Sequence, residues 1–540
     1  MAKCFSNLSP IIDMIGIPEV LRFFKIPTFF KTWLRGGSAM RKFFFISIMI
    51  AFSWFFVLQS GWVYAQNQSS TENNQPDLVE LGLSYFRLGM FQDAVQALEK
   101  GLASDKNNKI GWQNLAAAYR SQGFYDEAEE AYQLVLQLDN KDPRVWYEIG
   151  NLYYDMRNYQ MAIDAYDKSI SLNNSQPEVH YNLGNVYYDL QNFAKARDAY
   201  LKAVEIVPKY FDALNNLGNV YYYLNQTEEA EKAYFKAAAA QPRSPLPYYN
   251  LGNIYYRNRN YDLAIEQYKE ALDLDPEYVD ALNNLGNALS ELGNTEAAIE
   301  AYQKVIEIDP YYANAYFNAG LAYRDLGDSQ SAILQYQEAL QLIPEDPEIY
   351  YELGNVYYDM QDFQKAIESH TKAVGLDPNY IAAFNNLGNV YEALENYEKA
   401  LEAYGKAVEI DPNYTTSLYN IANIYYNQGN YYKSIDPFLK VVELNPQDYE
   451  AWNNLGNSYL EIGRYLAALN SYRKALRIKP DYDISHYNVG LVSLRLDDKE
   501  TAMREYDYLL SINKKLADAL MNEITGRSRE HEVEAQESNN

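Results

Sequence analysis

Cysteine is almost absent from this chain of 540 residues, and basic residues are too few to balance the acidic ones. Since the only cysteine is Cys4, the rest of the sequence can form no disulfide and supports no thiol chemistry. The formal net charge at pH 7 is −27, from 46 basic and 73 acidic residues. Phosphate binding needs a basic surface, so we expect no nucleic-acid partner.

Histidine is also scarce, and the four histidines, His180, His370, His486 and His531, do not cluster with other metal ligands along the sequence. A zinc site needs several such ligands close together, so no metal is expected. The sequence also lacks a Gly-rich phosphate loop and a local nucleophile motif. We therefore predict no catalytic residue and no cofactor, and we interpret the many acidic residues as solvated helix faces.

The feature that the sequence does have is a period of 34 residues. Residues 381–414 show it clearly, with Gly388 at position 8 of the stretch, Ala400 at position 20, Tyr404 at position 24 and Pro412 at position 32. Position 8 is Gly or Ala in thirteen successive repeats, and position 20 is Ala in twelve of them. A fixed period of this length indicates a repeat solenoid.

Within each repeat, apolar residues fall at helical spacing in two stretches, which are separated by a short polar turn such as Glu395-Asn396. Two amphipathic helices per repeat are therefore predicted. Glycine costs about 1 kcal/mol in a helix interior relative to alanine. We therefore expect Gly388 to have a packing role: the first helix would lie close to the second, where Ala400 is equally small, and the tyrosines would fill the remaining gap. Pro412 would end the second helix, because proline lacks an N–H group.

This pattern resembles the tetratricopeptide repeat (TPR), which has the same period and a similar signature. The resemblance covers residues 75–516 as thirteen repeats. It implies an all-α fold, a TPR solenoid in which antiparallel helix pairs form a right-handed superhelix, because one pair cannot bury its apolar face alone. Residues 517–525 are predicted to form a C-terminal capping helix, and residues 526–540, which are charged and polar, to be disordered.

The segment 40–65 has the pattern of a secretory signal peptide. It has a basic start, a long apolar run, and small residues in Val63-Tyr64-Ala65 before Gln66. The apolar run, residues 43–64, is also long enough to span a bilayer, so an N-terminal membrane anchor is the alternative. We expect the protein to be exported, periplasmic or extracellular, and anchored in the inner membrane if this segment is retained.

The stretches on either side of this segment are less informative. Residues 1–39 are apolar and basic, which would suit a membrane-surface segment. We favour the interpretation that they are an upstream extension and that translation starts at Met40 rather than Met1. Residues 66–74 are predicted to be a polar linker, because they have no means of packing.

In the TPR family, the first helices of successive repeats line a concave groove, and positions 9 and 12 face it. A carboxamide both donates and accepts hydrogen bonds, so a row of asparagines at position 9 could pair with the backbone of an extended peptide. Tyrosine at position 12 adds a flat apolar surface with a polar tip. The predicted peptide-binding groove comprises Asn151, Asn185, Asn219, Asn253, Asn287, Asn355, Asn389, Asn423 and Asn457, with Tyr154, Tyr188, Tyr222, Tyr256, Tyr358 and Tyr426. These residue types also belong to the family's average sequence, so a consensus without a ligand is the alternative.

The resemblance implies a non-enzymatic scaffold, and we predict an exported protein whose groove binds extended segments of protein or peptide partners. Position 5 is never Lys or Arg, so the clamp for C-terminal carboxylates found in one TPR subtype is not supported, and neutral or basic segments are favoured. One alternative is a membrane-tethered assembly factor for envelope or polysaccharide-export machinery, attached through residues 43–64. A further alternative is a non-catalytic subunit of a glycosyltransferase-type enzyme. Both alternatives rest on family analogy.

Overall fold

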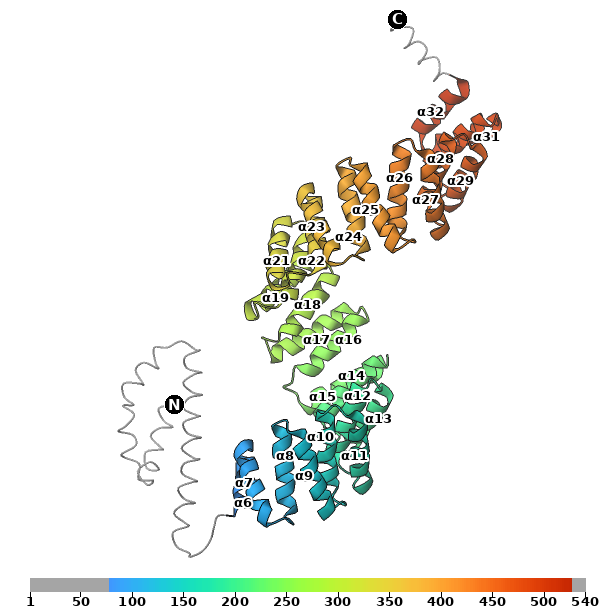
Figure 1. Ribbon diagram of the computed structural model, residues 1–540. Coiled ribbons are helices and arrows are strands. Elements are labelled where there is room, and N and C mark those ends of the chain that lie inside the picture. Colours follow the sequence, from blue (N-terminus) through green and yellow to red (C-terminus); the bar gives the residue numbers. More distant parts are fainter. Residues whose placement is uncertain (1–76, 527–540) are drawn as a thin grey trace, which may run out of the picture. The chain divides into compact units, whose positions relative to one another are not determined.

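A computed structural model of the protein describes residues 77–526 (Figure 1). Over this range the chain forms 27 α-helices and no β-strand. The predicted all-α solenoid of antiparallel helix pairs is therefore confirmed. The interpretations of residues 1–39, 40–65 and 66–74, and of the tail from residue 527 onward, lie outside the described residues.

Thirteen helix pairs follow one another, one pair for each repeat, and the repeats are numbered one to thirteen from the N-terminus. The first helices are α6 (Leu78–Arg87), α8 (Lys109–Ser121), α10 (Pro143–Asp155), α12 (Pro177–Asp189), α14 (Phe211–Tyr223), α16 (Leu246–Arg257), α18 (Val279–Glu291), α20 (Ala313–Asp325), α22 (Pro347–Asp359), α24 (Ile381–Ala393), α26 (Thr415–Asn427), α28 (Tyr449–Glu461) and α30 (Asp483–Arg495). The second helices are α7 (Phe91–Ser104), α9 (Tyr125–Leu138), α11 (Tyr159–Leu172), α13 (Phe193–Ile206), α15 (Thr227–Ala240), α17 (Tyr261–Leu274), α19 (Thr295–Ile308), α21 (Ser329–Leu342), α23 (Phe363–Leu376), α25 (Tyr397–Ile410), α27 (Tyr431–Leu444), α29 (Tyr465–Ile478) and α31 (Lys499–Ile512).

The chain divides into two compact parts, the first ending at Val186 and the second beginning at Tyr187. The boundary falls inside α12, the first helix of repeat four. Repeats one to three belong to the N-terminal part, and repeats five to thirteen belong to the C-terminal part. The contacts described below lie within one part or the other.

Each helix pair turns through one residue in the left-handed region, at position 15 of the repeat. In repeat ten this residue is Glu395, with a φ of 56°, and the next residue, Asn396, donates its backbone N–H to the carbonyl oxygen of Tyr391 at 2.8 Å. Glycine occupies position 15 in six repeats and a residue with a side chain occupies it in seven. Since glycine adopts this conformation without steric cost, the other seven turns carry a small local strain.

The second helix of repeat ten ends where the sequence predicts. Helix α25 stops at Ile410, and the backbone N–H of Asp411 donates to the carbonyl oxygen of Ala407 at 3.0 Å. Pro412 follows directly, and its missing N–H would leave the next helical hydrogen bond unmade. Proline therefore ends the second helix, as expected, and starts the connection to the following repeat.

Gly388 packs against a tyrosine of the second helix. A Cβ atom on Gly388 would lie 2.5 Å from the Cδ1 and Cε1 atoms of Tyr404, much closer than real Cβ contacts allow. Tyr404 is fully buried, so glycine at position 8 makes room for a large ring at position 24. The same pair recurs as Gly150–Tyr166, Gly218–Tyr234, Gly252–Tyr268, Gly286–Tyr302, Gly320–Tyr336 and Gly456–Tyr472. The predicted packing role of Gly388 is therefore confirmed, and Tyr404 fills the space beside it.

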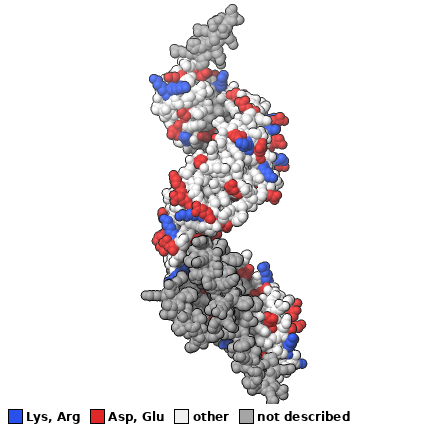
Figure 2. All heavy atoms as spheres, turned by 90° about the vertical axis from the view of Figure 1, so that its left-hand side faces the viewer, with Lys and Arg blue, Asp and Glu red and all other residues white. Residues whose placement is uncertain are grey.

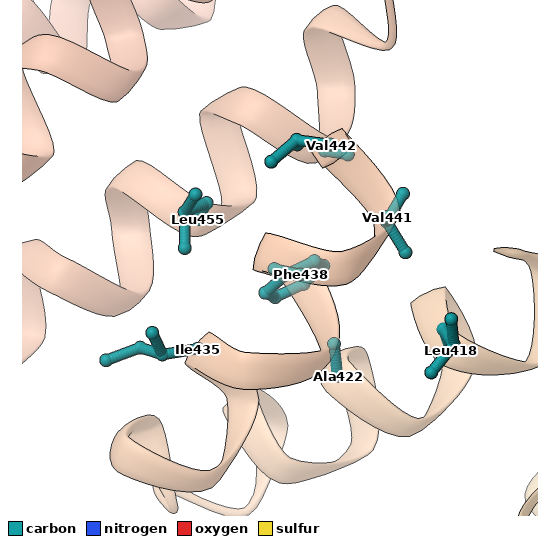
Figure 3. Packing of buried hydrophobic residues seen from close by; sticks show 8 residues of the cluster. Leu418, Ala422, Ile435, Phe438, Val441, Val442 and Leu455 are labelled. Carbon is teal, nitrogen blue, oxygen red and sulfur yellow. The ribbon is translucent and has the colours of Figure 1, made fainter. Parts of the chain in front are cut away.

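Repeat eleven packs a different pair at these positions, Ala422 and Phe438, and both side chains are fully buried. Figure 3 shows apolar side chains from α26, α27 and α28 gathered around Phe438. Helix α27 also contains Pro437, which lacks a backbone donor. The neighbouring Ser434 donates its hydroxyl to the Oγ atom of Ser458 at 2.8 Å. This repeat therefore replaces a glycine–tyrosine contact with a larger apolar cluster.

The last described helix, α32, spans Lys514–Thr525, so it begins before the predicted start at residue 517. It packs on repeat thirteen, where a Cβ atom on Gly490 would lie 2.5 Å from the Cδ2 atom of Leu520. Gly526 ends the helix in the left-handed conformation, with a φ of 76°. From residue 77 to residue 526, the structure contains no helix with the length and apolar character needed to cross a membrane.

Candidate functional site

The nine asparagines predicted for the groove all lie on first helices, at position 9 of their repeats. Asn151 is buried, with 7% of its surface exposed, and Asn219, Asn253 and Asn287 are half-buried. These last three belong to repeats five, six and seven, which are consecutive. A side chain at such a place can bond inward to the protein and outward to a ligand.

The carbonyl oxygens of these asparagines bond inward. In six repeats the hydroxyl group of the tyrosine at position 24 donates to Oδ1 of the asparagine in the same repeat, at 2.5–2.8 Å. The pairs are Tyr166–Asn151, Tyr234–Asn219, Tyr268–Asn253, Tyr302–Asn287, Tyr404–Asn389 and Tyr472–Asn457. The tyrosine that fills the space beside glycine thus also fixes the groove asparagine.

Five of these six oxygens, and that of Asn355, also accept a bond from the next repeat. An asparagine at position 6 of the following repeat donates its Nδ2 group at 2.8–3.3 Å, in the pairs Asn182–Asn151, Asn284–Asn253, Asn318–Asn287, Asn386–Asn355, Asn420–Asn389 and Asn488–Asn457. Each of these bonds joins two repeats. The sequence analysis missed this role, although the signal was available: all nine repeats with Asn at position 9 are followed by Asn at position 6.

These inward bonds determine what the groove can offer. The carbonyl oxygens of Asn253 and Asn287 accept from both a tyrosine and an asparagine, so both lone pairs are in use and the amide N–H₂ is the group left for a ligand. Among the described residues, the oxygen of Asn219 accepts from Tyr234 alone, because Asn250 donates to Asn215. Within residues 77–526, the Nδ2 atoms of Asn219, Asn253 and Asn287 have no hydrogen-bond partner, whereas Nδ2 of Asn151 and Asn355 donates to a glutamate. Repeats five to seven therefore present a row of hydrogen-bond donors, rather than the mixed donors and acceptors expected from sequence.

The tyrosines predicted at position 12 are half-buried and lean on the second helix of their own repeat. Tyr256 meets Tyr261 edge-on with ring centroids 5.5 Å apart, and Tyr426 meets Tyr431 at 5.3 Å. Tyr154, Tyr188 and Tyr358 make the same kind of contact with Tyr159, Phe193 and Phe363. Tyr222 instead receives the guanidinium of Arg257 over its ring, at 4.6 Å. These contacts hold each ring against its neighbours.

Two repeats lack an asparagine at position 9 although the repeat after each of them has one. In repeats two and eight, position 9 is Ala117 or Leu321, and the buried hydroxyl groups of Tyr132 and Tyr336 have no hydrogen-bond partner among the described residues. Position 12 is then arginine, and position 6 of the next repeat is glutamate in place of asparagine. Arg120 pairs with Glu148 at 3.1 Å and with Asp155 at 2.7 Å, and Arg324 pairs with Glu352. Burial raises the pKa of Glu352, and Arg324 opposes that rise.

The repeat after each of these two contains a cavity, and the two cavities are lined largely from the same repeat positions. The cavity in repeat three has a volume of about 250 Å³ and is lined by Arg120, Tyr147, Asn151, Tyr154, Asp155, Asn182 and Asn185. The cavity in repeat nine has a volume of about 240 Å³ and is lined by Asn355, Tyr358, Asp359, His370, Asn386 and Asn389. Six of the fifteen predicted groove residues therefore line cavities.

Other features of the described surface add little chemistry. Among residues 77–526, no group of three or more His, Cys, Asp or Glu side chains could hold a metal ion. Figure 2 shows one face of the molecule, on which acidic and basic side chains are interspersed over the described residues. No large area of that face is covered by Lys and Arg alone.

Models of one repeat family match the chain along most of the described range. Models described as "Tetratricopeptide repeat" match residues 78–108, 249–313, 301–334, 381–414, 416–448 and 438–470. A model described as "TPR repeat" matches residues 116–157, 150–191, 184–225, 218–258, 320–361, 354–395 and 456–497. Together they cover all but a few residues between 78 and 497.

Solved structures also match the chain. MamA is 32% identical over 30% of this chain and 95% of its own, with a TM-score of 0.29. YrrB, described as a TPR protein with an unusual peptide-binding site, is 25% identical over 35% of this chain and 97% of its own, with a TM-score of 0.31. The APC/C hetero-tetramer Cut9-Hcn1 is 17% identical over 84% and 96%, with a TM-score of 0.34. Among curated proteins, none matches the chain.

Proposed function

Because the chain belongs to the tetratricopeptide repeat family, we propose that it is a scaffold that holds an extended segment of a partner protein along its first helices. A scaffold of this kind needs a surface that contacts the backbone of the segment. Backbone contacts give affinity with little dependence on the partner's sequence, and pockets between them add selectivity.

The observation that supports this proposal is the row of amide donors on Asn219, Asn253 and Asn287. Each amide is held in one orientation, because its oxygen accepts from the tyrosine of its own repeat. An extended peptide presents carbonyl oxygens at regular intervals, and these are the acceptors that the row requires. Tyr222 and Tyr256 lie three positions along the same helices and supply apolar area beside the donors.

The decisive variant changes Asn219, Asn253 and Asn287 to Asp. A carboxylate still accepts from the tyrosine, and at Asn253 and Asn287 also from the next asparagine, but it cannot donate. Partners would be captured from extract on the tagged full-length protein, and the affinity of the strongest partner measured for each variant. We expect at least about tenfold weaker binding, since each lost hydrogen bond contributes roughly 0.5–1.5 kcal/mol. The added negative charge would not weaken the attraction for a basic segment.

The matched control changes Tyr234, Tyr268 and Tyr302 to Phe. This variant loses the inward bonds that orient the amides, but it keeps the donors themselves, so it should weaken binding less than the aspartate variant does. A second control, with Ala at the exposed residues Glu229, Glu266 and Glu300 on the second helices, should bind normally. Equal binding by the aspartate variant and both controls would place the partner elsewhere on the protein.

Export belongs to the same proposal. The basic start and apolar run of residues 40–65 suit a signal peptide, which would leave a mature protein beginning at Gln66. N-terminal sequencing of the native protein tests this directly. A retained segment would instead favour the membrane-tethered assembly factor, and a soluble mature chain that begins at Met1 would contradict both.

A further inference from the structure

Repeat nine differs from its neighbours at the position that holds the groove asparagine. His370 occupies position 24, where six other repeats have a tyrosine bonded to Asn. The imidazole is fully buried, and neither of its nitrogens has a hydrogen-bond partner within the described residues. Burial lowers the pKa of His370 to about 4, so the ring is neutral at pH 7 and has one lone pair to offer.

The side chain of His370, which is shorter than that of tyrosine, lies in the wall of the cavity of repeat nine. His370 is among the residues that line this cavity, together with Asn355 and Asn386. At the equivalent place in repeat three, Tyr166 does not line the cavity, and its hydroxyl donates to Asn151. The volume of about 240 Å³ is several times the roughly 30 Å³ that one water molecule occupies in the liquid.

The rim of this cavity carries an uncompensated negative charge. Asp359 is exposed and has no ion-pair or hydrogen-bond partner among residues 77–526. Its equivalent in repeat three, Asp155, is bound by Arg120 at 2.7 Å. The arginine that corresponds to Arg120 is Arg324, in repeat eight. It pairs instead with Asp325 at 3.7 Å and with Glu352 of repeat nine. One cavity is therefore neutralised from within, and the other is left acidic.

We propose that the cavity of repeat nine is a side-chain pocket for a lysine or arginine of the bound segment. This inference rests on the proposed function, since the cavity opens beside the asparagine row. Ammonium and guanidinium groups carry donors only, which matches the acceptors present: the carboxylate of Asp359 and the free lone pair of His370. Tyr358 adds an aromatic ring at the rim, against which a cation can rest.

The test uses two synthetic peptides that are identical except for one central residue, arginine in one and citrulline in the other. Citrulline has nearly the same shape as arginine but carries no charge. Full-length wild-type protein should bind the arginine peptide about tenfold more tightly. Asp359→Asn and His370→Tyr should each abolish this difference between the two peptides.

Asp325→Asn is the matched control, because Asp325 occupies the same repeat position as Asp359 but is paired with Arg324. It should keep the tenfold difference. A general attraction of arginine to the acidic chain would survive in His370→Tyr, which changes no charge at pH 7, so that result would overturn the pocket. We expect His370→Tyr to fold normally, since most other repeats have tyrosine at this position. Hydrogen exchange of α22 and α23 would verify that the variant is folded.

The outcomes separate this inference from the proposed function. If wild-type protein binds both peptides equally well, the groove stands and the pocket is wrong. If it binds neither peptide, the proposed groove fails as well.

Discussion

Repeats nine and eleven both keep a groove asparagine and both lack the tyrosine that should hold it, yet they respond differently. In repeat eleven the replacement is Phe438, which is buried in an apolar cluster with Ala422 beside it (Figure 3). In repeat nine the replacement is His370, with two buried nitrogens and no partner for either. Repeat eleven therefore has an apolar contact at position 24. Repeat nine has a polar side chain there without a hydrogen-bond partner among the described residues.

The difference shows that losing the tyrosine hydroxyl does not by itself produce a weak point. In repeat eleven the next asparagine, Asn454, donates to the hydroxyl of Tyr419 at 2.9 Å, so the joint to repeat twelve remains bonded. A buried polar group without a partner costs about 1–3 kcal/mol. Repeat nine carries that cost although Tyr or Phe would remove it, and a ligand that supplies the missing donor would offset it.

The largest contrast between the two repeats should come from deleting the side chain at position 24. Phe438→Ala should cost about 3–5 kcal/mol, because it removes a buried ring and leaves a cavity. His370→Ala should cost clearly less, since it also removes two unpaired nitrogens. Hydrogen exchange of α26 and α27, compared with α22 and α23, would measure the two effects locally. Equal losses of stability in the two variants would mean that the unpaired nitrogens of His370 do not destabilise the folded protein.

Acidification should affect repeat nine and spare repeat eleven. The pKa of His370 is about 4 in the folded protein and near 6.5 when unfolded, so the unfolded chain takes up the proton first. Stability is therefore fully present above pH 6.5 and falls between pH 6.5 and 4, by up to roughly 3 kcal/mol at 1.4 kcal/mol per pH unit. The measurement is hydrogen exchange of α22 and α23 at pH 7 and 4.5, with His370→Tyr as the control. An identical pH response in that variant would assign the effect to other groups.

Exchanging the small residues at position 8 should destabilise both repeats, in opposite ways. A Cβ atom on Gly354 would lie 2.4 Å from the Cε1 atom of His370, so Gly354→Ala should cost about 1–3 kcal/mol by overpacking. Ala422→Gly should cost about 1 kcal/mol, since glycine weakens a helix interior. Urea unfolding followed by circular dichroism, with exchange to locate the loss, measures both. A neutral Gly354→Ala would show that the imidazole can move.

The smallest contrast lies at the turns. Repeat nine uses Gln361 at position 15, with a φ of 61°, and repeat eleven uses Gly429, with a φ of 76°. Gln361→Gly should stabilise the protein by up to about 1 kcal/mol, and Gly429→Gln should destabilise it by a similar amount. Thermal unfolding of the two variants gives the comparison. Shifts of the same sign in both would show that the turn conformation is not what differs.

The fold could be predicted from sequence because it depends on local and periodic features. Helix α24 begins at position 1 of its repeat and α25 ends just before Pro412, so apolar spacing and proline were sufficient. The packing role of Gly388 was predicted, but a single repeat does not show which of its tyrosines lies against the glycine. Tyr404 does both jobs, filling the space beside the glycine and holding Asn389.

The candidate site was only partly visible for the same reason. The groove asparagines were found, but their oxygens bond to residues about 31 positions further on, in the next repeat. The pattern within one repeat contains no trace of that bond. The pocket in repeat nine depends on the absence of partners around His370, which only the packed structure reveals. From the sequence alone, His370 occupies an ordinary packing position.

The bonds between successive repeats have a consequence for how such an array can be cut and rejoined. Removing residues 279–312 would bring Asn253 to face Asn318, so the new joint would again be asparagine to asparagine. Removing residues 347–380 would instead set Arg324 against Asn386 and take away Glu352, its salt-bridge partner. A repeat of this protein can therefore be removed without loss of the contact between its neighbours only where the residues at positions 9 and 12 match those at position 6 of the repeat that then follows.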